Sequence, residues 1–142
     1  MIDGRRWRRT DPGIPEPLRR ELVRRLMHGR RAVAAALRTR DAKAEREARA
    51  QVHDAKLALG ERGAAWWDEP TEKALTERAA AIVRTLARER QPRGVSPTEV
   101  ARVLGGALRT GVPLARTAMR ELAGDGQVEL TVRGARMTAR LP

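Results

Sequence analysis

The near absence of aromatic residues limits what this chain can fold into. Its 142 residues include three Trp but no Phe and no Tyr, although 41% of them are hydrophobic. The core must therefore be built from Leu, Val, Ile, Met and Ala, a set that favours close-packed helices over two facing sheets. The length suits one ordinary domain or two small ones.

Two helices are expected in the first part of the chain. Between residues 15 and 40 apolar side chains recur about every four positions, which predicts an amphipathic helix. These residues are Leu18, Leu22, Leu26, Val33 and Leu37. Asp41 can cap a second helix that ends before Gly60. Its inward residues would be Ala44, Ala48, Val52, Ala55 and Leu59. The short connection favours an antiparallel hairpin, and one continuous helix is the main alternative.

The C-terminal half begins with two further helices. A helical period with an apolar face covers about residues 71–90. Ser96, Pro97 and Glu99 then suit the N-cap, N1 and N3 positions of a helix start. That helix is expected to be brief and to end at Leu104, before two glycines.

The remaining residues change from a helical to a strand period. A helix is expected to start near Val112–Pro113 and to run to Ala123, because Gly124 stops it. Apolar and polar residues alternate over 127–132, which predicts a strand with Val128, Leu130 and Val132 on one face. A tight turn at Arg133-Gly134 would let residues 136–141 return as its partner. Helix, short helix, helix and β-hairpin is the winged-helix order.

The expected fold class is therefore mainly α with a small β-hairpin, in which an N-terminal helical hairpin precedes a winged helix-turn-helix domain. The expected parts are a basic arm (1–14), the helical hairpin (15–60), a linker with a Trp pair (61–70) and the winged-helix domain (71–142). An amphipathic two-helix unit rarely buries its apolar stripe alone, so the hairpin is expected to pack on the helix at 71–90 or to form a homodimer.

The charge of the chain favours a polyanionic partner. The net charge is +12, and bases outnumber acids by 30 to 18. Codon bias can explain the preference for Arg over Lys, but it does not explain this excess. Residues 1–40 carry a net +8 and residues 71–142 a net +6, on either side of a middle with −2. Such an excess is the electrostatic footprint of a nucleic-acid-binding protein.

The helix at about 113–123 is the candidate reading helix. Its expected buried face is Ala115, Ala118, Met119 and Leu122. The opposite face presents Arg116, Thr117 and Arg120, of which arginine suits guanine and threonine suits a phosphate or a thymine methyl group. Arg109 precedes this helix, where a phosphate contact is expected.

The expected wing adds two more basic residues. Arg133 and Arg136 lie at the tip of the β-hairpin, where they could reach a minor groove or the backbone. Glu121 and Asp125 would oppose a phosphate contact nearby. An exposed arginine is also common on ordinary surfaces, and winged-helix modules can be protein–protein adaptors.

The N-terminal arm carries Arg5, Arg6, Arg8 and Arg9 around Trp7. These arginines are candidate contacts to a minor groove or an RNA backbone, with a simply solvated arm as the alternative. The hairpin would gather Trp7, Trp66 and Trp67 at one end. A hydrophobic plug that holds the arm is favoured there over a platform for stacking bases.

Other chemistry is not expected. The chain has no Cys, no G-x-S-x-G elbow and no phosphate-binding glycine loop, so neither an enzyme nor a cofactor is expected. His28 and His53 could face each other across the helical hairpin, but ordinary surface histidines fit the pattern better, and no metal is expected. With no long apolar run, the expected location is the cytoplasm, without a membrane partner.

Several segments resemble one bacterial domain family of unknown function, which is usually predicted to be winged-helix. In the C-terminal half these are SPTEVAR (96–102), RELAGDGQVELTVRG (120–134) and ARLP (139–142). In the N-terminal half, residues 2–27 and DAKLALGERGAAWW (54–67) resemble the front of small actinobacterial proteins that carry this domain. The resemblance implies a fold but no established activity.

Together these features predict a nucleic-acid-binding protein that contacts DNA through a winged helix, as a transcription regulator or a nucleoid-associated protein would. A basic protein associated with RNA or the ribosome is the first alternative. A winged-helix adaptor in a protein complex is the second.

Overall fold

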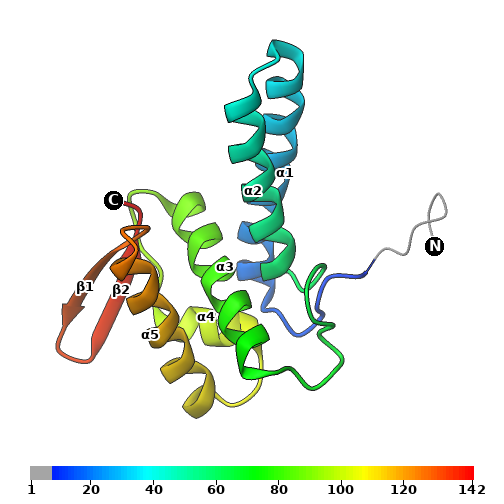
Figure 1. Cartoon of the computed structure of the whole chain (residues 1–142). Coiled ribbons are helices and arrows are strands. Elements are labelled where there is room, and N and C mark those ends of the chain that lie inside the picture. Colours follow the sequence, from blue (N-terminus) through cyan, green and yellow to red (C-terminus); the bar gives the residue numbers. More distant parts are fainter. Residues whose placement is uncertain (1–7) are drawn as a thin grey trace.

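The structure, a computed structural model that describes residues 8–142, confirms a mainly α fold with a small β-hairpin (Figure 1). In chain order the elements are α1 (Glu16–Thr39), α2 (Ala42–Ala58), α3 (Glu72–Arg90), α4 (Pro97–Leu104), α5 (Leu108–Gly124), β1 (Glu129–Arg133) and β2 (Arg136–Arg140). Helices α1 and α2 lie side by side and project away from the rest of the molecule.

The connection between α1 and α2 settles the choice between a hairpin and one long helix. Arg40 has φ 53°, a left-handed conformation that ends α1. Asp41 then caps α2, because its side chain accepts a hydrogen bond from the backbone N–H of Ala44 at 3.0 Å. The two helices approach closely at Gly29, where an added Cβ would lie 2.9 Å from Cγ2 of Val52. The expected antiparallel hairpin is confirmed.

The outer end of the hairpin is less buried than the apolar stripe of α1 predicted. Leu18, Leu22 and Leu26 are buried, but Val33 is half-buried and Leu37 is 53% exposed. The prediction is wrong for Leu37 because this end of α1 lies beyond the reach of α3 (Figure 1). Only α2 remains beside it.

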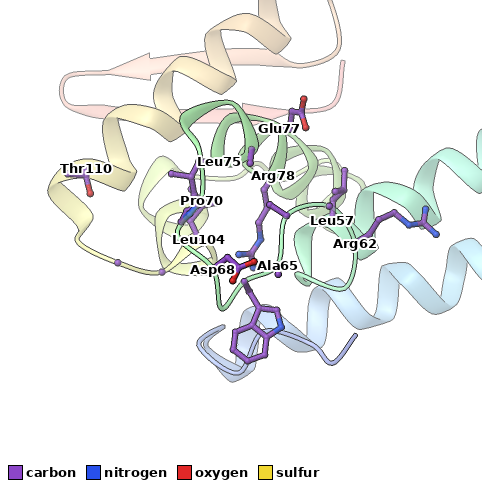
Figure 2. A pocket seen from close by; sticks show the side chains of 16 residues that line it. Leu57, Arg62, Ala65, Asp68, Pro70, Leu75, Glu77, Arg78, Leu104 and Thr110 are labelled. Atoms are coloured by element: carbon purple, nitrogen blue, oxygen red, sulfur yellow. The ribbon is translucent and has the colours of Figure 1, made fainter. Parts of the chain in front are cut away.

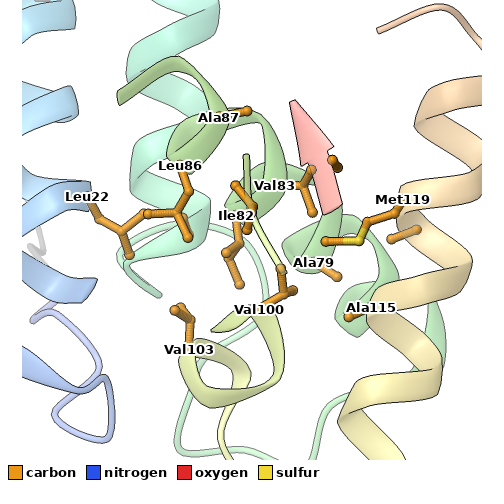
Figure 3. Close-up of a cluster of buried hydrophobic side chains, with 14 of the residues drawn as sticks. Leu22, Ala79, Ile82, Val83, Leu86, Ala87, Val100, Val103, Ala115 and Met119 are labelled. Carbon is orange, nitrogen blue, oxygen red and sulfur yellow. The ribbon is translucent and has the colours of Figure 1, made fainter. Parts of the chain in front are cut away.

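Helix α3 lies at the centre of the molecule. It packs against α1, α2, α4, α5 and β2. Leu86 of α3 faces Leu22 of α1, while Met119 of α5 approaches α3 from the opposite side (Figure 3). These residues belong to one cluster of buried hydrophobic side chains that extends from α1 to β2. The same helix therefore supports the hairpin and the C-terminal elements.

Helix α5 begins earlier than expected. Its first residue is Leu108, not Val112 or Pro113, because the N–H groups of Thr110 and Gly111 already bond to the carbonyl of Ala107. Pro113 lies inside the helix, where it lacks the N–H that would bond to the carbonyl of Arg109 and its ring crowds that carbonyl. Arg109 is exposed, so water can satisfy this carbonyl.

The β-hairpin is shifted slightly from its expected position. Strand β1 spans Glu129–Arg133, and Arg133 pairs with Arg136, so the turn consists of Gly134 and Ala135. The expected turn at Arg133-Gly134 is thus wrong by one residue. Val132 shares a strand face with the half-buried Leu130 but is 60% exposed, because it lies next to the tip of the hairpin.

The β-hairpin is attached to the connection between α3 and α4. Val95 and Ala139 exchange two backbone hydrogen bonds, with N–O distances of 2.7 and 2.9 Å. A Cβ added to the neighbouring Gly94 would clash with Cγ2 of Thr138. Glycine is therefore required where this connection passes β2.

Glu99 joins the start of α4 to the end of α3. Its Oε1 accepts hydrogen bonds from the backbone N–H and the hydroxyl of Ser96, each at 3.1 Å, which completes the expected capping box. Its Oε2 lies 2.7 Å from Nη2 of Arg90. Burial raises the pKa of Glu99, but the bonds from Arg90 and Ser96 and the charge of Arg90 outweigh burial, so this pKa falls below its ordinary value of 4.5.

Replacing Glu99 by Gln is expected to lower the free energy of unfolding by about 1 kcal/mol near neutral pH, because the variant loses a charge-assisted hydrogen bond. The folded-state pKa of Glu99 is depressed, so its contribution is complete above the ordinary pKa and is lost as the pH falls through the folded-state value. Urea unfolding of both proteins at a series of pH values measures the difference. A difference that stays constant well below the ordinary pKa would contradict this assignment.

Candidate nucleic-acid interface

The exposed face of α5 carries the residues expected to read bases. Ala115, Ala118, Met119 and Leu122 are buried, as predicted. Their burial turns the opposite face outward, where the candidates Arg109, Arg116, Thr117 and Arg120 line one shallow groove together with Leu108, Val112 and Pro113. The structure thus brings all four candidates of this helix onto one surface.

Arg116 also links α5 to the β-hairpin. Its Nη2 donates a hydrogen bond to the carbonyl oxygen of Ala135 at 3.0 Å. Arg116 and Arg136 line a second groove, which is completed by Ser96, Pro97, Thr98, Ala135, Met137 and Thr138. Because Arg116 belongs to both grooves, the face of α5 is continuous with the hairpin tip.

Two candidates on α5 have part of their polar groups committed to the fold. Arg116 is half-buried, and within residues 8–142 its Nε has no hydrogen-bond partner. The hydroxyl of Thr117 donates to the carbonyl of Pro113 at 3.1 Å, while the side chain remains exposed. Thr117 therefore offers its methyl group and its hydroxyl oxygen as an acceptor. Arg116 offers Nη1 and the N–H of Nη2 that is not bonded to Ala135.

The hairpin tip adds Arg133 and Arg136, both exposed and paired across the strands. Among the described residues, neither of them forms an ion pair, and the same holds for Arg109 and Arg120. The acids expected to oppose a phosphate are also present, since Glu121 and Asp125 are exposed nearby in the sequence. Glu129 is neutralised by Arg140, whose Nη2 lies 3.2 Å from its Oε2. The unpaired charge at the tip and along the groove is positive.

Arg8 and Arg9 lie elsewhere. Arg5 and Arg6 fall outside the described residues. Arg8 donates to the carbonyl of Gly63 at 2.6 Å, which places residues 8–14 beside the linker and away from the β-hairpin (Figure 1). Arg9 is exposed on this same segment. The structure therefore does not bring Arg8 and Arg9 to the face formed by α5 and the hairpin.

The tryptophans of the linker hold this segment in place. Trp66 donates from Nε1 to the carbonyl of Arg9 at 3.0 Å and is half-buried. Trp67 meets Trp66 edge-on, with ring centroids 5.1 Å apart, and Arg8 lies 5.5 Å from the Trp67 ring centroid. Trp7 lies outside the described residues. The contacts of Trp66 fit a plug that holds the arm, while Trp67 is 61% exposed.

The sequence did not indicate how many arginines form ion pairs within the fold. Asp54 is only 5% exposed and pairs with Arg84 at 3.0 Å and with Arg88 at 2.7 Å. Arg78 pairs with Asp11 at 3.1 Å. The helical period of α2 places Asp54 beside the face that contains Ala48 and Ala55, not on it, so the sequence alone contains no clear signal of its burial. A net charge counted from the sequence therefore overstates the arginines that are free to bind a partner.

The described part of the chain offers neither a metal site nor a membrane-spanning helix. No group of three or more His, Asp and Glu side chains there could hold a metal ion. His53 instead lies 2.9 Å from Nη1 of Arg62, through its Nδ1. No helix over these residues is apolar for long enough to span a membrane.

Comparison with known proteins concerns the same C-terminal region. No curated protein and no solved structure matches the chain. Residues 76–140 match a family described as "Protein of unknown function (DUF3253)". The match runs from α3 to β2 and includes the whole face formed by α5 and the β-hairpin. The expected C-terminal domain of unknown function is thus present.

Proposed function

We propose that this protein binds nucleic acid, with duplex DNA as the first candidate, through α5 and the β-hairpin in the manner of a winged helix. The order α3, α4, α5, β1, β2 supports this proposal, since it is the order of winged-helix domains. The bridge between Val95 and Ala139 supports it further, because it attaches the wing to the helices.

One observation carries the proposal. Arg109, Arg116 and Arg120 line a single groove along α5, and Arg116 is bonded to the backbone of the hairpin tip. Arginine is the side chain best suited to bidentate contacts with guanine and with phosphate. In the proposed complex α5 enters a major groove, with Arg120 facing bases and Arg109 a phosphate. Arg133 and Arg136 hold the backbone or an adjacent minor groove.

Fluorescence anisotropy with labelled nucleic acids tests the proposal. Duplex DNA, single-stranded DNA and structured RNA are compared at low and at moderate salt, because phosphate contacts make affinity fall with salt. Binding that is tightest for duplex DNA supports the proposal, and a preference for one sequence at moderate salt supports a regulator. Equal, salt-sensitive binding to every duplex supports a nucleoid-associated protein. A preference for RNA, or no binding to any of them, overturns the DNA proposal.

Replacing Arg109 and Arg120 together by Ala is expected to weaken duplex binding at least about tenfold. The slope of log affinity against log salt should also become shallower, by about one for each lost phosphate contact. Arg116 is left intact because its removal would also break the bond to Ala135. Anisotropy titrations at several salt concentrations measure both effects.

The matched control replaces Arg38 and Arg46 by Ala. These residues are exposed at the outer end of the helical hairpin and form no ion pair among the described residues. The control lowers the net charge by the same amount, so a general polyanion effect would weaken both double variants equally. Equal weakening would contradict a site on α5.

A further inference from the structure

A cavity of about 320 Å³ lies between the linker, the start of α3 and the turn between α4 and α5 (Figure 2). Its wall is largely apolar and is formed by Leu57, Trp66, Pro70, Leu75 and Leu104. Charged side chains from Arg62, Asp68 and Glu77, all exposed, lie at its edge. A volume of this size, with apolar walls and few polar groups, is typical of small-molecule sites.

Arg78 is the one charged side chain of the lining that is largely removed from water. Its Nε and Nη2 donate to the carbonyl of Ala58, at 3.3 and 3.1 Å, and Nη2 lies 3.1 Å from Oδ2 of Asp11. Its Nη1 donates to no acceptor within residues 8–142. Nη1 still reaches solvent, so its two N–H donors are available to a ligand.

Arg78 itself can bind a second anionic group, even with Asp68 and Glu77 at the edge of the cavity. Burial lowers the pKa of Arg78, and the charge and hydrogen bond of Asp11 only partly oppose this effect. One carboxylate therefore does not fully offset the cost of burying this guanidinium. An additional acceptor with a negative charge would lower that cost further.

We propose that this cavity binds a small molecule with an apolar body and one carboxylate group, which accepts hydrogen bonds from Nη1 of Arg78. The apolar body lies against Leu57, Leu75 and Leu104 and beside the ring of Trp66. The site is separate from the groove on α5, and its occupation by a ligand does not rest on the proposed function.

The cavity also touches the segment that leads into α5. Leu104, Gly105, Gly106 and Thr110 belong to its lining, and Arg109 directly precedes Thr110 in the chain. Gly105 and Gly106 have φ of 80° and 76°, and a side chain added at either would meet nothing within 4 Å. Neither glycine is therefore packed against another residue on the side where a Cβ would stand. A ligand that contacts Leu104 and Thr110 restricts the turn and the first residues of α5.

The test uses the whole protein without nucleic acid. It needs one fluorescent reporter and two competitors of similar shape, one of which carries a negative charge while the other is neutral. Anilinonaphthalene sulfonate, an apolar anion, reports binding by its fluorescence, and phenylbutanoate or its neutral amide, phenylbutanamide, competes with it. Phenylbutanoate is expected to compete about tenfold better than the amide, because only the carboxylate forms a charge-assisted bond with Arg78. Saturating phenylbutanoate is expected to slow amide hydrogen exchange over residues 104–110.

Ala74→Leu places a larger side chain in the cavity and leaves Arg78 unchanged, since Ala74 is part of the lining. This variant is expected to bind phenylbutanoate at least about tenfold more weakly. Ala50→Leu adds the same group at an exposed position of α2 and should bind like the original protein. Absence of saturable binding, equal competition by the acid and the amide, or unchanged binding by a folded Ala74→Leu variant would each overturn the proposal.

Discussion

The Asp54→Ala variant is expected to lose about 3 kcal/mol of unfolding free energy, a large share of the stability of a chain this size. The carboxylate of Asp54 accepts hydrogen bonds from Nε and Nη2 of Arg84 and from Nη1 of Arg88, at 2.7 to 3.1 Å. Removing it leaves two guanidinium groups without their partner. Their side chains are 24% and 22% exposed, so water can solvate them in part, and the loss stays at the lower end of the range for buried ion pairs.

Chemical denaturation followed by circular dichroism measures this loss. Glu47→Ala is the matched control, because it removes a carboxylate from the same helix at an exposed position, where its pair with Lys43 is 4.0 Å long. The control is expected to change the unfolding free energy by less than about 0.5 kcal/mol. Equal effects of the two substitutions would mean that Asp54 does not hold α2 on α3.

The second large effect is expected for Leu86→Ala, which should lower the free energy of unfolding by about 3 kcal/mol. Leu86 is fully buried and faces Leu22 across the contact between α3 and α1 (Figure 3). The substitution removes apolar surface from the core and leaves a cavity that the surrounding helices can fill only in part. Leu37→Ala removes the same atoms from a side chain that is 53% exposed, and it should cost less than about 1 kcal/mol.

Leu86→Ala also tests whether the helical hairpin and the C-terminal elements unfold together. Their buried side chains form one continuous cluster, so a single transition is expected in the variant as in the original protein. Calorimetry and circular dichroism should give the same midpoint. Two separate transitions would show that the hairpin folds independently of the rest.

The helix boundaries that depend on a local signal could be predicted from the sequence. Asp41 and Ser96 cap helices in the structure as their positions indicated, because a capping bond joins residues only three apart. The start of α5 has no such signal. Ala107 precedes this helix without a side-chain cap, and Pro113 suggested a beginning that the backbone does not have. The preference of proline for the first turn of a helix therefore placed the predicted start of α5 several residues too late.

The candidate site could be predicted only in part. The helical period of α5 was sufficient to separate the buried Ala115 and Met119 from the outward Arg116 and Arg120. The position of Arg8 depends on contacts with the linker, more than fifty residues along the chain, and no local pattern records them. The ion pairs of Asp54 are likewise tertiary. A count of arginines could not distinguish those that bind acids of the fold from those that remain unpaired.

The bond from Arg116 to the tip of the β-hairpin has a consequence for sequence change. Its acceptor is a main-chain carbonyl, so any residue at position 135 that keeps the turn can supply it. Insertion or deletion at the tip would move that oxygen away from the guanidinium. Variants of this protein should therefore tolerate new side chains at Ala135 while the two-residue length of the loop stays fixed.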